Sequence, residues 1–135
     1  MIDDHGPMPP EYLTVPGLPA LSNSRILDWY DGPLIFRADG DDGCVWVGST
    51  LGRAMEPSDP PIVAGGFVGW TKYVDSWVYA QLDAATVEDV LHSVRPFRAL
   101  YTDARALWRV DVTWLSTGGS PGQSEPTATA TRHTV

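Results

Sequence analysis

The distribution of proline and glycine is the feature that most limits how this chain can fold. Proline removes a backbone hydrogen-bond donor and fixes φ, and glycine favours turns, so regular elements must lie between clusters of the two. Residues 1–24 contain five prolines, and residues 116–126 contain three glycines and two prolines before an alternation of Thr and Ala. We therefore expect a proline-rich, partly ordered leader over 1–24, a single folded domain over 25–115 and a disordered tail over 116–135.

Composition excludes several classes of protein. The chain has 135 residues, of which 43 % are hydrophobic and 19 % charged, and such a composition is typical of a folded globular domain. No apolar run approaches the roughly 20 residues of a membrane helix, and the acidic N-terminus lacks the basic start and apolar stretch of a secretory signal. We expect a cytoplasmic protein that makes no membrane contact. The single cysteine, Cys44, cannot form an internal disulfide.

Five short segments combine branched and aromatic residues between turn residues, which predicts strands. The fifth alternates strictly, with its tryptophans and valines on one face and polar residues on the other. The second and third flank the short polar loop 39–43 and predict a hairpin. Residues 55–61 contain three prolines and predict a loop. The five predicted strands are 26–30, 34–38, 44–48, 76–82 and 107–115.

Two helices are predicted between the fourth and fifth strands. Thr86 and Asp89 have the spacing of a capping box and predict a helix that begins at Thr86. Its apolar stripe would consist of Val87, Val90, Leu91 and Val94. Pro96 ends this helix and starts a second, which would direct Phe97, Leu100 and Tyr101 to the core. The order predicts an α+β fold: a small antiparallel sheet of four to five strands covered by two short helices, with a disordered C-terminal tail.

Two segments together carry a resemblance to a known family. Residues 30–36 read Tyr-Asp-Gly-Pro-Leu-Ile-Phe, and residues 90–100 read Val-Leu-His-Ser-Val-Arg-Pro-Phe-Arg-Ala-Leu before a final strand rich in Trp and Val. The combination resembles a family of small uncharacterised bacterial proteins with a Tyr-Asp-Gly-Pro-Leu-Leu-Phe hairpin, a strand, two short helices and a last strand. The resemblance spans about residues 27–112. It implies the same order of elements and carries over no activity, and the stretch 52–76 is longer and richer in Gly and Pro than the family pattern.

Negative charge is concentrated in the first half of the chain. The formal net charge is −8, and residues 1–59 hold ten acids and three bases. A chain without a basic stripe is not expected to bind nucleic acid directly. Asp39, Asp41 and Asp42 predict an acidic surface at the tip of the first hairpin, where a solvated loop is favoured over a calcium site because no ordered set of further oxygen ligands follows.

Few residues suggest catalysis. Asp28 and Asp31 could pair for acid–base chemistry, but Asp31 is better explained as a residue that starts a turn. His92 lies in the predicted helix without a nucleophile or a second histidine at ligand spacing, which favours a surface position. Cys44 follows an acidic loop, which favours a buried structural thiol over a reactive one. We expect no enzyme activity, no metal and no cofactor.

An aromatic cluster with one cation is the strongest candidate for a binding site. It consists of Trp70, Lys72, Tyr73, Trp77 and Tyr79. Such residues can form a core, anchor a protein partner or stack on a ligand, and the sequence leaves all three interpretations open.

These observations favour a non-enzymatic protein–protein interaction module, such as an accessory or immunity-type partner in a bacterial operon. An acidic half would steer a basic partner, and the aromatic cluster would supply anchors. The alternative is a small-molecule-binding domain or minor enzyme with an Asp/His and aromatic pocket, which requires at least two of these groups to converge. The sequence leaves self-association and the identity of the partner open.

Overall fold

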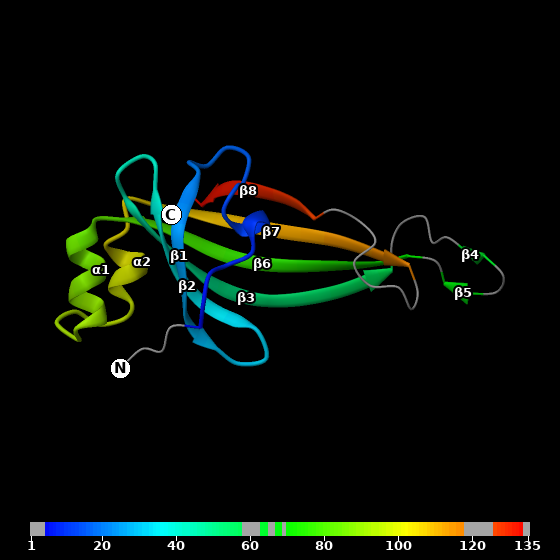
Figure 1. Ribbon diagram of the computed structural model, residues 1–135, viewed down its shortest axis with the longest axis horizontal. Helices are drawn as coiled ribbons and strands as arrows, with labels where there is room; N and C mark the ends of the chain where they lie inside the picture. The colour runs from blue at the N-terminus through cyan, green and yellow to red at the C-terminus, as the bar shows by residue number, and fades with distance from the viewer. Residues whose placement is uncertain (1–4, 58–62, 65–66, 69, 118–125, 134–135) are drawn as a thin grey trace.

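The computed structural model describes residues 5–57, 63–64, 67–68, 70–117 and 126–133. In this part of the chain the main sheet has six antiparallel strands in the order β1-β2-β3-β6-β7-β8 (Figure 1). They are β1 (Leu21–Trp29), β2 (Pro33–Gly40), β3 (Val45–Pro57), β6 (Trp70–Leu82), β7 (Ala106–Thr117) and β8 (Thr127–His133). Between β3 and β6 the short strands β4 (Val63–Ala64) and β5 (Phe67–Val68) pair with each other. The helical elements are the 3-10 turn η1 (Pro10–Tyr12), α1 (Ala84–Leu91) and α2 (Ala99–Thr102).

The fold is α+β, as the sequence predicts, but the main sheet has six strands rather than four to five. Strands β3 and β6 are 13 residues each and stay paired from Val45–Leu82 to Pro57–Thr71. Residues 55–57 of the predicted loop 55–61 therefore belong to strand β3, and that part of the prediction is wrong. Pro57 is the last residue of its strand, where a missing N–H interrupts no further pairing.

The prediction of a disordered tail over 116–135 is wrong for residues 116–117, which end strand β7, and for residues 127–133, which form strand β8 at the edge of the sheet. Its alternating residues suit a strand: Ala128 and Ala130 pack against the core while the threonines are exposed. Strand β7 supplies a continuous backbone partner over seven positions. The low hydrophobicity of residues 127–133 suggests disorder, but this segment is ordered because strand β7 supplies its backbone hydrogen bonds. Residues 118–125 of the predicted tail lie outside the described part of the chain.

The helices begin and end at different residues from those predicted. Helix α1 begins at Ala84 after an Asp83 N-cap, and Thr86 is a buried residue within it instead of its cap. The helix ends at Leu91, and Ser93 has a positive φ of 62°. The chain therefore turns before Val94, which is 72 % exposed and does not continue the apolar stripe.

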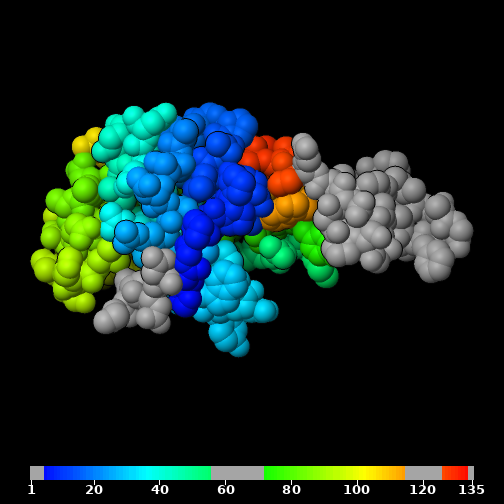
Figure 2. Space-filling view, viewed as in Figure 1, coloured from blue at the N-terminus to red at the C-terminus, as the bar shows by residue number. Residues whose placement is uncertain are grey.

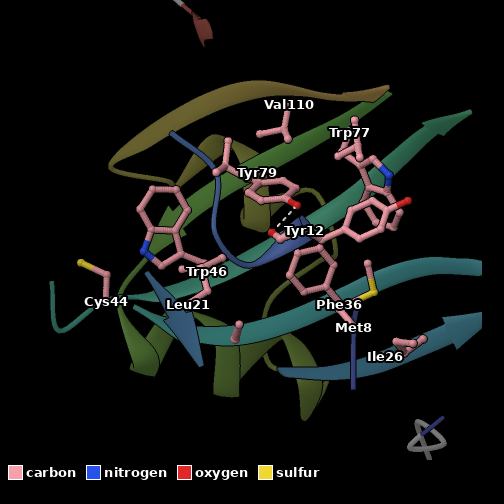
Figure 3. Packing of buried hydrophobic residues seen from close by; sticks show 13 residues of the cluster. Met8, Tyr12, Leu21, Ile26, Phe36, Cys44, Trp46, Trp77, Tyr79 and Val110 are labelled. Carbon is pink, nitrogen blue, oxygen red and sulfur yellow. Dashed lines mark hydrogen bonds between the residues drawn. The ribbon is translucent and has the colours of Figure 1, made fainter. Parts of the chain in front are cut away.

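The two faces of the sheet carry separate apolar clusters because successive strand residues point to opposite sides. One face contributes Val47, Ala80 and Leu82 to a cluster that also contains Val87 of α1 and Leu100 of α2. The other face holds most of the large aromatic residues; Figure 3 shows Phe36, Trp46, Trp77 and Tyr79 packed together there. Rings of Phe36 and Tyr79 meet edge to face with centroids 5.3 Å apart. The predicted alternation of the last strand is confirmed, since Val110 and Val112 are fully buried on this face.

The proline-rich N-terminal segment covers the aromatic face. It crosses the sheet as the blue chain in Figure 1, and its Met8, Tyr12 and Val15 are all at most 4 % exposed. The Tyr79 hydroxyl donates to the Tyr12 carbonyl at 2.8 Å (Figure 3). The described part of the leader is thus a structural layer, and the sheet lies between it and the helices.

Candidate functional site: an apolar cleft between helix α1 and the sheet

An apolar cleft of about 340 Å³ lies between the helices and strands β1–β3. Its deepest residues, Val47, Val87 and Leu100, are buried members of the helix-side cluster. Its walls are half-buried aliphatic side chains from β1, β2 and α1: Leu27, Ile35, Val90 and Leu91. The cleft exists because α1 is only eight residues long and packs against one end of the sheet. A volume in this range suits one compact apolar group.

Aromatic residues stand at the rim of the cleft. Phe97 lines it and is 49 % exposed, with its ring edge to face against Tyr101 at 6.1 Å. On the opposite side His5 lines the cleft and its ring lies 6.4 Å from that of Trp29, which is 48 % exposed. Tyr30 follows at the β1–β2 turn and is 81 % exposed. This turn projects from the body of the molecule in Figure 2. Exposed aromatic residues around an apolar pocket are typical anchors of a binding surface.

The charge beside the cleft is negative. Asp28 is the one lining residue with a formal charge at neutral pH, and its Oδ1 accepts the Trp29 N–H at 2.9 Å. Asp31 lies in the adjacent turn, with a positive φ of 56° before Gly32. On the helix side Arg95 is held by the carboxylates of Asp89 and Asp103 at 2.9 and 3.2 Å. A cationic group would therefore be attracted to the carboxylates beside Trp29.

The described residues that line the cleft are mostly apolar. His5 and Asp28 are the polar members of a set of ten, and the set contains no serine, threonine, cysteine or lysine. The cleft can bind an apolar group and shield it from water, while the carboxylate of Asp28 contacts a polar group next to it.

The predicted aromatic cluster is divided by the structure. Trp77 and Tyr79 are 1 % and 0 % exposed and belong to the core, so they do not form a surface. Lys72 and Tyr73 are half-buried on β6, outside the cleft, and their role in partner binding stays a prediction. Trp70 begins β6, and its side chain lies outside the described part of the structure. Alternation places Lys72 on the opposite face of β6 from Tyr73, Trp77 and Tyr79, because neighbours in sequence point to opposite faces.

The three predicted acidic residues, Asp39, Asp41 and Asp42, are exposed at the β2–β3 turn. Asp39 accepts a hydrogen bond from Asn23 at 3.2 Å. Asp42 has a structural role, because it accepts bonds from the Cys44 N–H, the Trp46 indole and the Gln81 amide at 3.1, 3.2 and 2.8 Å. Partial burial pushes the pKa of Asp42 up, but these hydrogen bonds outweigh burial and lower the pKa.

The other candidate residues do not converge on one site. Asp28 lines the cleft, whereas Asp31 lies in the turn and His92 follows the end of α1 on the surface. His92 Nδ1 contacts the Glu88 carbonyl at 2.8 Å. Cys44 is buried, in accordance with the structural interpretation. Of Asp28, Asp31 and His92, the cleft holds Asp28, and its other lining residues include an imidazole, His5, and an aromatic ring, Phe97.

Sequence reasoning misses the residues that form the cleft. The sequence predicts Phe97 in the core, but this residue precedes α2 at the rim.

In the described ranges, no three histidine, cysteine or acidic side chains are grouped closely enough to hold a metal ion. None of the helices seen there has the length and apolar character to cross a bilayer. Comparison with protein-family models, curated proteins and solved structures finds no match to this chain.

Proposed function

We propose that this chain is a non-enzymatic protein–protein interaction module that takes an apolar side chain of a basic partner segment into the α1 cleft. The observation that carries the proposal is the cleft itself, which has a buried aliphatic floor, the half-exposed ring of Phe97 at its rim, and the half-exposed ring of Trp29 next to the lining residue His5. Large apolar side chains exposed together around a hollow are costly in water unless a partner covers them. The surface proposed for the partner is therefore the cleft rather than the predicted cluster on β6.

The charge beside the cleft specifies the partner's chemistry. Asp28 and Asp31 flank Trp29 and Tyr30, and Arg95 on the other side is already neutralised by two carboxylates. A lysine or arginine next to the apolar anchor would gain charge complementarity there, which also speeds association. The partner segment is thus expected to combine one large aliphatic or aromatic residue with flanking cations.

Synthetic peptides test this proposal directly. The first probe is an amphipathic peptide of about 15 residues with a central leucine and flanking lysines; matched peptides carry alanine at the centre or glutamates at the flanks. Binding would be measured by amide NMR shifts of isotope-labelled protein. We expect the Leu/Lys peptide to shift resonances of Leu27, Val87 and Phe97, and each replacement to weaken binding about 10-fold or more. Shifts confined to other surfaces, or equal binding of the glutamate peptide, would contradict the proposal.

Two variants on one connection provide a matched control. Phe97→Ala removes a rim ring that lines the cleft, and Val94→Ala removes a more exposed side chain that does not line it. We expect Phe97→Ala to weaken the Leu/Lys peptide about 10-fold, while Val94→Ala leaves its affinity within about 2-fold. Val94→Ala should unfold at the wild-type temperature because Val94 is 72 % exposed, and thermal unfolding should show that Phe97→Ala is still fully folded at the temperature of the binding measurement.

A small-molecule-binding domain is the second candidate, and the volume of about 340 Å³ favours it. Indole is a suitable neutral probe because it fills such a space without charge. Saturable indole binding at the cleft resonances, with no response to the Leu/Lys peptide, would support this function and overturn the interaction module.

A further inference from the structure

The two edges of the six-stranded sheet are built differently. An edge strand leaves backbone N–H and C=O groups free to pair with another chain, and proteins commonly protect such edges with bulges or covering segments. Strand β1 has both kinds of protection. Its register with β2 shifts three times, and the leader bonds its outer side: the Ile26 N–H donates to the Gly6 carbonyl at 2.8 Å and the Ile26 carbonyl accepts the His5 N–H at 3.1 Å.

Strand β8 has no bulge in its pairing with β7, and within the described part of the chain the leader contacts it through η1 without hydrogen-bonding to its outer side. Its register with β7 runs without a shift from Leu107–His133 to Thr113–Thr127. It contains no proline, and no described residue hydrogen-bonds to its outer side. The contacts of Ala128 and Ala130 with the core fix β8 in position at the edge of the sheet. This edge is therefore a regular, seven-residue template for another strand.

The sequence of β8 indicates which strand would fit. In a protein of net charge −8, this edge carries Arg132 and His133 and no acid. Two copies can therefore approach through it with the least repulsion. An antiparallel arrangement centred on Ala130 sets Thr129 opposite Thr131 of the second copy and Arg132 opposite Ala128 of the second copy. Thr–Thr pairs across strands are favourable, and no like charges face each other in this register.

We infer that the chain associates with a second copy of itself by antiparallel pairing of β8 with β8, which joins two six-stranded sheets into one across a two-fold axis. The contact is isologous, so it closes at a dimer and leaves both covered β1 edges at the ends. It also leaves the α1 cleft open, because the cleft is formed by β1–β3 at the opposite side of the sheet. Dimerisation is therefore independent of the proposed function.

Sedimentation velocity of the whole chain, from about 1 to about 200 µM, tests the inference. We expect a monomer–dimer equilibrium that tightens as salt is added, since salt screens repulsion between two acidic molecules. Hydrogen exchange at the same concentrations should show amides of residues 127–133 becoming more protected as dimer forms. A monomer at every concentration, or a dimer without added protection in β8, would overturn the inference.

Two charge variants locate the interface. In the proposed register, Thr129→Lys with Thr131→Lys places two lysine–lysine pairs across the two-fold axis, and we expect about 10-fold weaker dimerisation. The matched control, Thr129→Lys with Thr131→Glu, places two lysine–glutamate pairs there and should dimerise at least as tightly as wild type. Because the double-lysine protein has the less negative net charge, overall repulsion cannot explain a loss of dimer. Equal dimerisation of the two variants would contradict the β8 interface.

Discussion

At the scale of single residues, one buried carboxylate holds the leader on the sheet. Asp75 accepts a hydrogen bond from the Tyr12 hydroxyl at 2.5 Å and two from Arg53 at 3.0 and 3.1 Å. Burial, followed by the bond to Asp75, raises the pKa of Tyr12 far above its ordinary value. The bond to Asp75 also raises the pKa of Arg53. The phenol therefore stays protonated and donates, and the arginine stays charged.

Tyr12→Phe tests whether the hydrogen bond from Tyr12 to Asp75 holds the leader on the sheet. The substitution removes one donor to a buried charge while Arg53 remains, so we expect the free energy of unfolding to fall by about 1.5–3 kcal/mol. Urea denaturation measures the change. Tyr30→Phe removes the same hydroxyl from a side chain that is 81 % exposed and should change stability by less than about 0.5 kcal/mol. Equal effects of the two substitutions would show that the Tyr12 hydroxyl does not hold the leader.

Asp42→Asn tests the β2–β3 turn through its pH dependence. Because folding lowers the pKa of Asp42, its contribution to stability is present at neutral pH and is lost as the pH falls through the folded pKa, below about pH 4. We expect the Asp42→Asn substitution to lower the free energy of unfolding by about 1 kcal/mol at pH 7, and the difference from wild type to shrink as the pH falls through the folded pKa of Asp42. Urea denaturation at a series of pH values from neutral to acid measures this. A difference that is constant with pH would exclude the carboxylate charge as its cause.

At the scale of elements, the packing of β2 against β3 depends on a glycine. Gly48 lies opposite Phe36 in the register of the two strands, and a Cβ at Gly48 would overlap the ring of Phe36. That ring cannot move aside, since it is fully buried and packs edge to face against Trp77 and Tyr79 at 5.6 and 5.3 Å. Because Gly48 has no side chain, the ring of Phe36 has room to lie over strand β3.

We expect Gly48→Ala to lower the free energy of unfolding by about 1–3 kcal/mol through overpacking. Thermal and urea denaturation measure the loss. Phe36→Leu alone should also destabilise, because it leaves a cavity, but in the Gly48→Ala protein it should make room for the new methyl group. The double substitution is therefore expected to cost less than the two single changes added together. Simple additivity would mean that the clash is relieved elsewhere.

At the scale of the whole molecule, one sheet is covered on its two faces by different parts of the chain. The helices cover one end of one face, and the leader covers the aromatic face. The start of the described leader lies close to the helices, because His5 hydrogen-bonds to β1 and also lines the α1 cleft. The leader thus contributes both to the core and to the candidate binding site.

Two methionines test whether the leader is part of the cooperative fold. Met8 in the leader is 3 % exposed, and Met55 on β3 is 68 % exposed. We expect Met8→Ala to lower the free energy of unfolding by about 2–5 kcal/mol, and Met55→Ala to change it by less than about 0.5 kcal/mol. Both would be measured by urea denaturation followed through tryptophan fluorescence. A near-neutral Met8→Ala would show that the leader detaches without unfolding the sheet.

Local patterns in the sequence determined the positions of most elements. Alternation along residues 107–115, the polar turn 39–43 and the apolar spacing after Ala84 each reflect contacts between near neighbours, and the corresponding strands and α1 are present. The burial of Cys44 and the exposure of His92 also followed from their local surroundings.

Only the tertiary structure decided which surfaces are free. Trp77 and Trp29 are chemically alike in the sequence, yet the leader covers one and leaves the other half exposed beside a cleft. Strand β8 is ordered because β7 offers it a ladder, and the cleft exists because a short helix covers part of a longer sheet. These features depend on pairing and packing between distant segments, which residue spacing along the chain does not encode.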